Sequence, residues 1–263
     1  MADWLQLKRD GVRLACLDFG GGAPNVLMLH GLAGHSGEWA KTAAALGSAL
    51  RIIALDQRGH GRSERDPGDV SRAAYVADVV TVLQQLGLVP AVLIGQSMGG
   101  NTAYLTAASR PELVQSLVVI EASPDGPLPE LPEQIRRWLD SWPVPFVDAD
   151  QARAFFAEQG LAADAWAEGL EQHEDGLWPA FEKDVMVDCI ADVAARDYWK
   201  QWREIRCPTL IVAGGRGHID EAHATELARL LPRGEAVTIP GAGHDVHLDA
   251  PERLAHEIRR FLC

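Results

Sequence analysis

The sequence predicts an α/β domain built on a mostly parallel, doubly wound sheet that carries a helical insertion. Two observations support this fold class. Short apolar runs, closely followed by glycine or an acidic residue, alternate with amphipathic stretches, and the alternation is interrupted between residues 124 and 202. Alternating strands and helices are typical of parallel sheets covered on both faces. With 263 residues, the chain can form one such domain with an inserted subdomain.

Eight segments are expected to form the sheet. Near the N-terminus, Trp4–Leu7 and Val12–Phe19 alternate apolar with polar residues, which favours an antiparallel hairpin at the sheet edge. The other segments are short apolar runs, typical of strands buried on both faces. They are Val26–Leu29, Arg51–Leu55, Ala91–Ile94, Ser116–Ile120, Thr209–Ala213 and Ala236–Ile239.

The stretches between these runs are expected to be helices. They are Glu38–Leu50, Arg72–Leu86, Met98–Arg110, Ala222–Leu231 and Pro251–Leu262. In the last of them, Asp249 is positioned as an N-cap and Pro251 stands in the first turn. Leu254, Ile258 and Phe261 then fall on one face, which predicts a helix that packs against the sheet.

The interruption predicts a cap over the sheet. It opens with a proline-rich stretch and then takes a helical pattern, so we expect a core of residues 1–123 and 203–263 and a cap of residues 124–202. Six of the eight tryptophans fall in the insertion: Trp138, Trp142, Trp166, Trp178, Trp199 and Trp202. Such residues either form the cap's own core or line an apolar substrate pocket. As pocket candidates we take Trp138, Trp142 and Trp178.

Composition narrows the classes of function. The formal net charge of −13 repels phosphate backbones, so we expect no nucleic-acid partner. The cysteines form no CxxC pair and the histidines no i, i+4 pair with a glutamate base, so we expect neither a metal site nor a cofactor. The N-terminus lacks a signal-peptide pattern and no apolar run has the length of a membrane span, which favours a cytoplasmic protein.

The segment Gly95-Gln96-Ser97-Met98-Gly99 matches G-x-S-x-G and stands between a predicted strand and a predicted helix. A nucleophile elbow requires this strand–turn–helix context. The glycines leave room for a tight turn with strained dihedral angles at the serine. Such a turn presents Ser97 Oγ at the C-terminal end of its strand, where open α/β sheets bind ligands. We therefore predict that Ser97 is a nucleophile.

A serine hydroxyl needs a base that takes its proton. We predict that this base is His244, which lies in a glycine-rich loop between the last predicted strand and the last predicted helix; His247 is the alternative. A tetrahedral intermediate also needs backbone donors for its oxyanion. The expected donors are the amides of Met98, directly after the nucleophile, and of Leu32, in the loop after the Val26–Leu29 strand.

Together these motifs resemble those of the α/β-hydrolase superfamily over nearly the whole chain. They are His30-Gly31, the Asp56-x-x-Gly59-x-Gly61-x-Ser63 turn, the Gly95–Gly99 elbow and Gly241-x-Gly243-His244. The resemblance implies an α/β-hydrolase fold, with a mostly parallel eight-stranded sheet and a helical cap. It leaves the reaction open, because this family includes esterases, lactonases, C–C hydrolases, perhydrolases and cofactor-free oxygenases.

The acid of the triad departs from the common family pattern. The resemblance places an aspartate a few residues after the strand Thr209–Ala213, where this chain has His218. Asp220 is nearby, but an N-cap role explains it. Glu121 ends the strand Ser116–Ile120, a position where the zearalenone-lactonase group and the haloalkane dehalogenases carry their acid. A carboxylate at the end of a buried strand needs a partner, and the imidazolium of a triad is one. We predict Glu121 as the acid, with Asp220 as the alternative.

The expected function is a metal-free serine hydrolase that cleaves an ester or lactone with an apolar body through an acyl-enzyme. One alternative keeps the fold and changes the chemistry: a C–C bond hydrolase or a cofactor-free oxygenase, in which His244 deprotonates the substrate itself. Another is a non-catalytic ligand receptor that keeps the pocket. Replacing Ser97 with alanine separates the first alternative from a serine esterase, and turnover of a small aryl ester separates the second.

Overall fold

The computed structural model describes residues 2–263, and the eight expected strands form one sheet. The strands are β1 (Asp3–Arg9), β2 (Val12–Gly20), β3 (Asn25–Leu29), β4 (Arg51–Asp56), β5 (Ala91–Gln96), β6 (Val114–Ile120), β9 (Thr209–Gly214) and β10 (Gly234–Ile239). Their order across the sheet is β1-β2-β4-β3-β5-β6-β9-β10. β2 pairs antiparallel with both β1 and β4, and all other neighbours are parallel. The predicted sheet with its antiparallel edge hairpin is confirmed.

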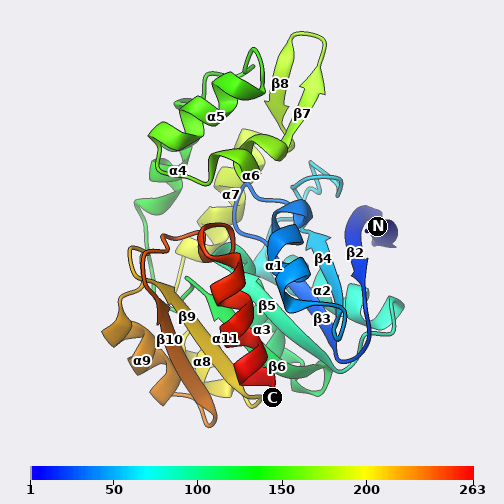
Figure 1. Ribbon diagram of the computed structural model, residues 1–263, viewed down its shortest axis with the longest axis vertical. Coiled ribbons are helices and arrows are strands. Elements are labelled where there is room, and N and C mark those ends of the chain that lie inside the picture. The colour runs from blue at the N-terminus through cyan, green and yellow to red at the C-terminus, as the bar shows by residue number, and fades with distance from the viewer. Residues whose placement is uncertain (1) are drawn as a thin grey trace.

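Helices cover both faces of the sheet (Figure 1). One face is covered by α2 (Arg72–Gln85), α3 (Met98–Ser109), α8 (Trp199–Glu204) and α9 (Glu221–Arg229). The other face is covered by α1 (Ala40–Leu46), α10 (Val246–Asp249) and α11 (Pro251–Leu262). Two short 3₁₀ turns, η1 (Ser36–Trp39) and η2 (Pro111–Leu113), complete the core. Within residues 2–263, no helix combines the length and the apolar character that crossing a membrane requires.

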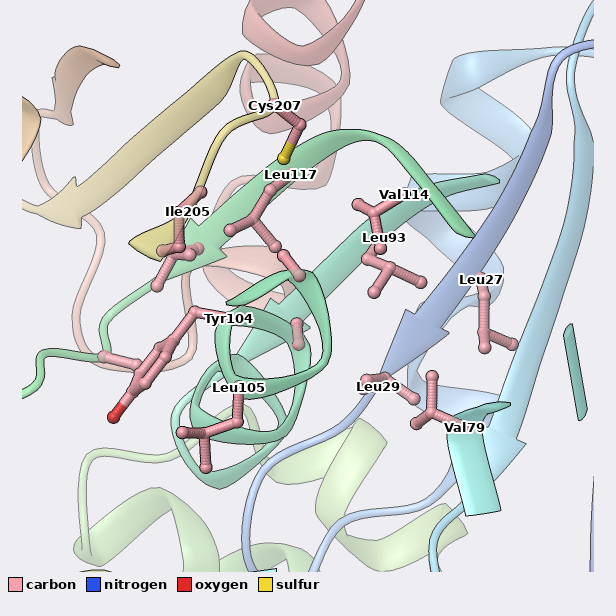
Figure 2. Close-up of a cluster of buried hydrophobic side chains, with 14 of the residues drawn as sticks. Leu27, Leu29, Val79, Leu93, Tyr104, Leu105, Val114, Leu117, Ile205 and Cys207 are labelled. Atoms are coloured by element: carbon pink, nitrogen blue, oxygen red, sulfur yellow. The ribbon is translucent and has the colours of Figure 1, made fainter. Parts of the chain in front are cut away.

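The side chains of each inner strand alternate between two apolar clusters. On β3, Leu27 and Leu29 belong to the cluster on the α2–α3 face, whereas Val26 and Met28 belong to the cluster on the α1–α11 face. A strand period of two residues produces this alternation. Figure 2 shows the first cluster, where Val79 of α2 lies beside Leu29. Because both faces are buried, the inner strands appear in the sequence as continuous apolar runs.

The insertion forms a cap at one end of the core, at the top of Figure 1. Its elements are α4 (Leu131–Asp140), α5 (Ala149–Glu158), α6 (Ala163–Glu168), the antiparallel hairpin of β7 (Leu170–His173) and β8 (Gly176–Pro179), and α7 (Lys183–Ala194). The cap has an apolar cluster of its own, centred on aromatic residues that include Trp142, Phe146 and Phe156. The chain enters the cap after β6, so the cap begins directly beyond a strand end.

The C-terminal end of the insertion differs from the expected boundary at residue 202. Helix α8 packs on α3 of the core. Trp202 is fully buried in the core cluster, where its indole N–H donates to the Leu227 carbonyl oxygen at 3.1 Å and its ring meets Tyr104 edge-on. We therefore assign Trp199 and Trp202 to the core. The expected boundary lay close to the start of β9, where the strand–helix alternation resumes, and α8 is a helix that precedes this strand.

Candidate active site

Ser97 occupies a sharp turn between β5 and α3. Its φ of 51° and ψ of −119° lie in a region that side chains rarely adopt, at a cost on the order of 1–3 kcal/mol. Both flanking glycines are required by close backbone packing. A Cβ atom on Gly95 would lie 2.2 Å from the carbonyl oxygen of Gly99, and one on Gly99 would lie 2.3 Å from that of Leu29. The turn has the strand–turn–helix geometry predicted for a nucleophile elbow.

Glu121 directly follows β6, the neighbour of β5, and has a positive φ of 50° as well. Its side chain is fully buried, with Oε1 accepting the Gly214 N–H at 2.7 Å and Oε2 accepting the His218 N–H at 2.6 Å. The loop after β9 therefore wraps around this carboxylate. Gly217 in that loop must lack a side chain, because a Cβ atom there would lie 2.2 Å from Oε1. The two amide donors fix the position of the carboxylate.

His244 pairs with Glu121 and not with the alternative acid. His244 Nδ1 lies 3.3 Å from Glu121 Oε2, which makes a long hydrogen bond. Asp220 instead accepts the His223 N–H at 2.8 Å and caps the N-terminus of α9, in the role that the sequence suggested for it. The ring of His244 forms no other hydrogen bond within the described chain, which leaves Nε2 for the Ser97 hydroxyl.

The alternative base, His247, belongs to a separate buried pair. Its Nε2 lies 2.9 Å from Glu38 Oε1, and its ring packs against Trp39. Burial alone would raise the pKa of Glu38, but the charge and the hydrogen bond of His247 outweigh burial and lower that pKa to about 2. His247 is not among the described residues that line the cavity of Ser97, so we assign it a structural role.

His218 stacks on His244, the predicted base. The rings of His218 and His244 have centroids 4.3 Å apart and an interplanar angle of 22°. Burial, and next the neighbouring His244, lower the pKa of His218, so its ring is neutral at neutral pH. The residue that stands where the family pattern places an aspartate thus contacts both remaining partners, Glu121 through its backbone and His244 through its ring.

Glu121, His218 and His244 also form a group whose ligand atoms lie within 4.8 Å of one another. This spacing is compatible with a metal ion, but the ring orientation is not. The two imidazole rings are nearly parallel, so their nitrogen lone pairs do not converge on one point. Glu121 Oε2 already accepts an amide hydrogen from His218. We therefore interpret the group as an acid, a base and a stacking neighbour.

Ser97 and His244 line one cavity of about 580 Å³, a size typical of small-molecule sites. The cap and its entry loop supply most of its apolar wall, with Leu128, Leu131, Ile135, Trp138, Leu161, Trp166, Ile190 and Val193. Its acidic residues are Glu121, Asp125, Asp245 and Asp249. Among the residues that the structure describes, no lysine or arginine lines the cavity.

The two predicted oxyanion donors lie at the same cavity. Leu32 follows β3 and Met98 begins α3, and both line the wall beside Ser97. In the described chain, neither backbone N–H donates to a protein acceptor, so both remain available to an oxyanion. Gly31 allows the Leu32 loop to pass close to the elbow, because a Cβ atom at Gly31 would lie 2.2 Å from Gln96 Oε1.

The tryptophans of the cap separate into two groups. Trp138 lines the cavity of Ser97, whereas Trp142 and Trp178 line a different cavity of about 550 Å³. Trp142 packs within the cap cluster, 5.0 Å from the Phe156 ring centroid, and the Trp178 indole N–H donates to Asp175 at 2.9 Å within the hairpin. The pocket prediction is therefore corrected at Trp142 and Trp178. Sequence spacing did not reveal which face of each segment turns toward the substrate.

Among the lining residues that were not predicted as site residues, Gln96, Asp245 and Trp166 have polar groups close to the Ser97–His244 pair. Gln96 and Asp245 carried a usable signal, because each is the chain neighbour of a predicted catalytic residue and has a polar side chain. Trp166 was noted as one of several tryptophans in the insertion, with nothing to distinguish it from the others. All three line the cavity.

Comparisons with known proteins identify the family. Residues 24–251 match the family model described as alpha/beta hydrolase fold. The sn-1-specific diacylglycerol lipase ABHD11 of Mus musculus is 31% identical over 91% of this chain and 81% of the lipase. Esterase YbfF of Escherichia coli is 27% identical, over 90% of this chain and 92% of the esterase. The crystal structure of E-2-(acetamidomethylene)succinate hydrolase matches with a TM-score of 0.89 and 26% identity, covering 100% of this chain and 99% of that one.

The chain belongs to the alpha/beta hydrolase family. The relatives are named as a lipase, an esterase and a hydrolase of E-2-(acetamidomethylene)succinate, so the family places the chain among hydrolases.

Proposed function

We propose that this protein is a serine hydrolase that cleaves a carboxylic ester or lactone with an apolar body through an acyl-enzyme. The observation that carries the proposal is the convergence of Ser97, on a strained elbow, and the His244–Glu121 pair at a single cavity. The similarity to proteins named as a lipase and an esterase supports it.

In the proposed mechanism, Ser97 Oγ attacks the carbonyl carbon while His244 Nε2 takes the hydroxyl proton. Glu121 holds the ring with Nδ1 protonated and stabilises the imidazolium that forms. The amides of Leu32 and Met98 donate to the oxyanion. His244 then returns the proton to the leaving alkoxide, which stays attached to the acyl group if the substrate is a lactone. Water attacks the acyl-enzyme by the same route, releasing the acid and regenerating Ser97.

The lining of the cavity favours an uncharged substrate. Its walls are apolar on the cap side, and its ionisable lining residues are histidines and acids. A substrate carboxylate placed there would lose water without gaining a cationic partner, at a cost of several kcal/mol. We therefore propose a neutral acyl chain as the group that contacts the cap, and not the dicarboxylate named for the structural neighbour.

A pair of p-nitrophenyl esters tests the reaction and the charge preference together. The neutral butyrate should be hydrolysed at least about 10-fold better, in kcat/KM, than the anionic hemisuccinate, because the cavity offers no cation. A fluorophosphonate probe should modify Ser97, as located by peptide mass spectrometry. Ser109→Ala is the matched control for Ser97→Ala, because Ser109 ends the helix that Ser97 precedes and lies outside the cavity.

The same experiment separates the alternatives. Turnover of an ester that survives in Ser97→Ala would indicate chemistry in which His244 acts without the serine, as in a cofactor-free oxygenase. Absence of both turnover and probe labelling in the unmodified protein would contradict the proposal and favour a ligand receptor.

A further inference from the structure

Asp245, the residue after the catalytic histidine, binds two neutral donors from different parts of the fold. Its Oδ1 accepts the side-chain amide of Gln96 at 3.2 Å, and its Oδ2 accepts the indole N–H of Trp166 at 3.1 Å. Because a donor faces each oxygen, the site requires an acceptor at both positions. A carboxylate satisfies both, whereas an amide of the same shape satisfies one.

The first of these bonds ties Asp245 to the elbow. Gln96 immediately precedes Ser97, and its Nε2 donates to the His244 carbonyl oxygen at 3.1 Å as well as to Asp245. One side chain therefore links the nucleophile turn to two successive residues of the loop that carries the base. This arrangement fixes the loop relative to Ser97.

The second bond ties the same loop to the cap. Trp166 lies on α6 and forms part of the cavity wall, with its ring edge-on to Trp138 at a centroid distance of 5.8 Å. It also packs 5.7 Å from the Phe156 ring centroid in the cap cluster. Asp245 thus links this wall to the loop that carries His244, in addition to the ring packing within the cap.

We propose that Asp245 is a specificity-determining residue, which holds Trp166 against the catalytic loop and thereby sets how long an acyl chain the cavity accepts. The inference rests on the proposed ester hydrolysis. Hydrogen bonds to a charged acceptor contribute more than neutral ones, so their loss should change the position of the wall measurably. Trp166→Phe removes the N–H donor while keeping an aromatic ring, and Asp245→Ala removes the acceptor.

The test measures kcat/KM for p-nitrophenyl octanoate and acetate and takes the octanoate-to-acetate ratio. This ratio should change roughly 10-fold in both Trp166→Phe and Asp245→Ala, since both variants lose the charge-assisted hydrogen bond between Trp166 and Asp245. Asp245→Ala also loses the bond from Gln96, which should affect both esters alike and therefore leave the ratio unchanged. The ratio of the double variant should differ from that of Asp245→Ala by less than about 2-fold, because Trp166 and Asp245 act on the wall through the bond that they share. Trp138→Phe is the matched control. It removes the same atoms as Trp166→Phe from a residue of the same wall, but the indole N–H of Trp138 has no hydrogen-bond partner among the described residues. Its ratio should change by less than about 3-fold.

Equal changes in Trp166→Phe and Trp138→Phe, or additive effects in the double variant, would overturn the inference and leave wall size as the determinant. A second measurement does not depend on turnover. The indole ¹⁵N–¹H resonance that disappears in Trp166→Phe should move in Asp245→Ala, and an unmoved resonance would also overturn it. Failure of the unmodified enzyme to cleave any ester would contradict the proposed function, while the resonance would still test the contact.

Discussion

The C-terminal edge of the sheet and the cap position their site residues by different means. At the sheet edge, Ser97 and Glu121 directly follow adjacent parallel strands, and each adopts a positive φ that turns the chain at the strand end. In the cap, Trp138 and Trp166 reach the cavity because of how helices from distant parts of the insertion pack. The polar residues at the sheet edge are therefore positioned by the local backbone at strand ends, whereas the shape of the pocket depends on tertiary contacts in the cap.

The largest effect expected at the sheet edge comes from the nucleophile. Ser97→Ala and Ser97→Gly should each lower kcat/KM for ester hydrolysis by at least roughly 10⁴-fold, because no other group supplies the nucleophile. Glycine adopts the φ of 51° without strain, so Ser97→Gly should also melt about 2–6 °C higher than Ser97→Ala. Calorimetry checks this difference. Equal melting temperatures would show that the elbow stores no strain.

The same distinction explains how far the sequence alone could predict the molecule. The sheet followed from apolar runs, and Ser97 followed from a G-x-S-x-G motif at the end of one of them. The choice of Glu121 over Asp220 as the partner of His244 depended in part on the resemblance to hydrolases that carry their acid at this strand end, since parallel strands bring their C-terminal ends to one edge. The cap lining did not follow, because two of its three predicted tryptophans face elsewhere. Helix faces in a small insertion are chosen by packing among many aromatic residues, and a list of those residues does not determine which of them line a cavity.

The next prediction concerns the loop that packs around the buried Glu121 carboxylate. Gly217→Ala should lower kcat roughly 10- to 100-fold, because the new methyl group would displace the Glu121 carboxylate that it would otherwise meet at 2.2 Å. Gly22→Ala, whose nearest neighbour would be a backbone oxygen at 3.3 Å and which lies far from the site, is the control. Steady-state kinetics of both variants decides the point. A fully active Gly217→Ala would mean that the position of this carboxylate does not limit catalysis.

A smaller effect is expected from the stacked histidine. His218→Ala should lower kcat roughly 2- to 10-fold, because the ring of His244 loses a stacking partner of the strength found for aromatic pairs. His218→Phe should restore most of the rate, since it keeps the ring and removes its nitrogens. If phenylalanine is as poor as alanine, a nitrogen of His218 takes part in the reaction and stacking is not its role.

The smallest effect on catalysis is expected in the cap cluster. Trp142→Phe should change the octanoate-to-acetate ratio by less than about 2-fold, because Trp142 packs inside the cap and does not line the cavity of Ser97. Its cost should appear in thermal stability, at roughly 1–2 kcal/mol for the lost ring packing. If Trp142→Phe changed the chain-length preference as much as Trp166→Phe, then Trp142 would also determine the shape of the cavity, and the separation into buried and lining tryptophans would be wrong.

The central claim, that the acid of the triad follows β6, is tested most directly by comparing Glu121→Gln with Asp220→Asn. Glutamine keeps the shape of the side chain but not its charge, so kcat should fall on the order of 10²–10⁴-fold. Tryptophan fluorescence should show that the variant remains folded. Asp220→Asn should retain nearly full activity, because asparagine also caps a helix. A severe loss in Asp220→Asn together with an active Glu121→Gln would contradict the account and return the acid to the loop after β9.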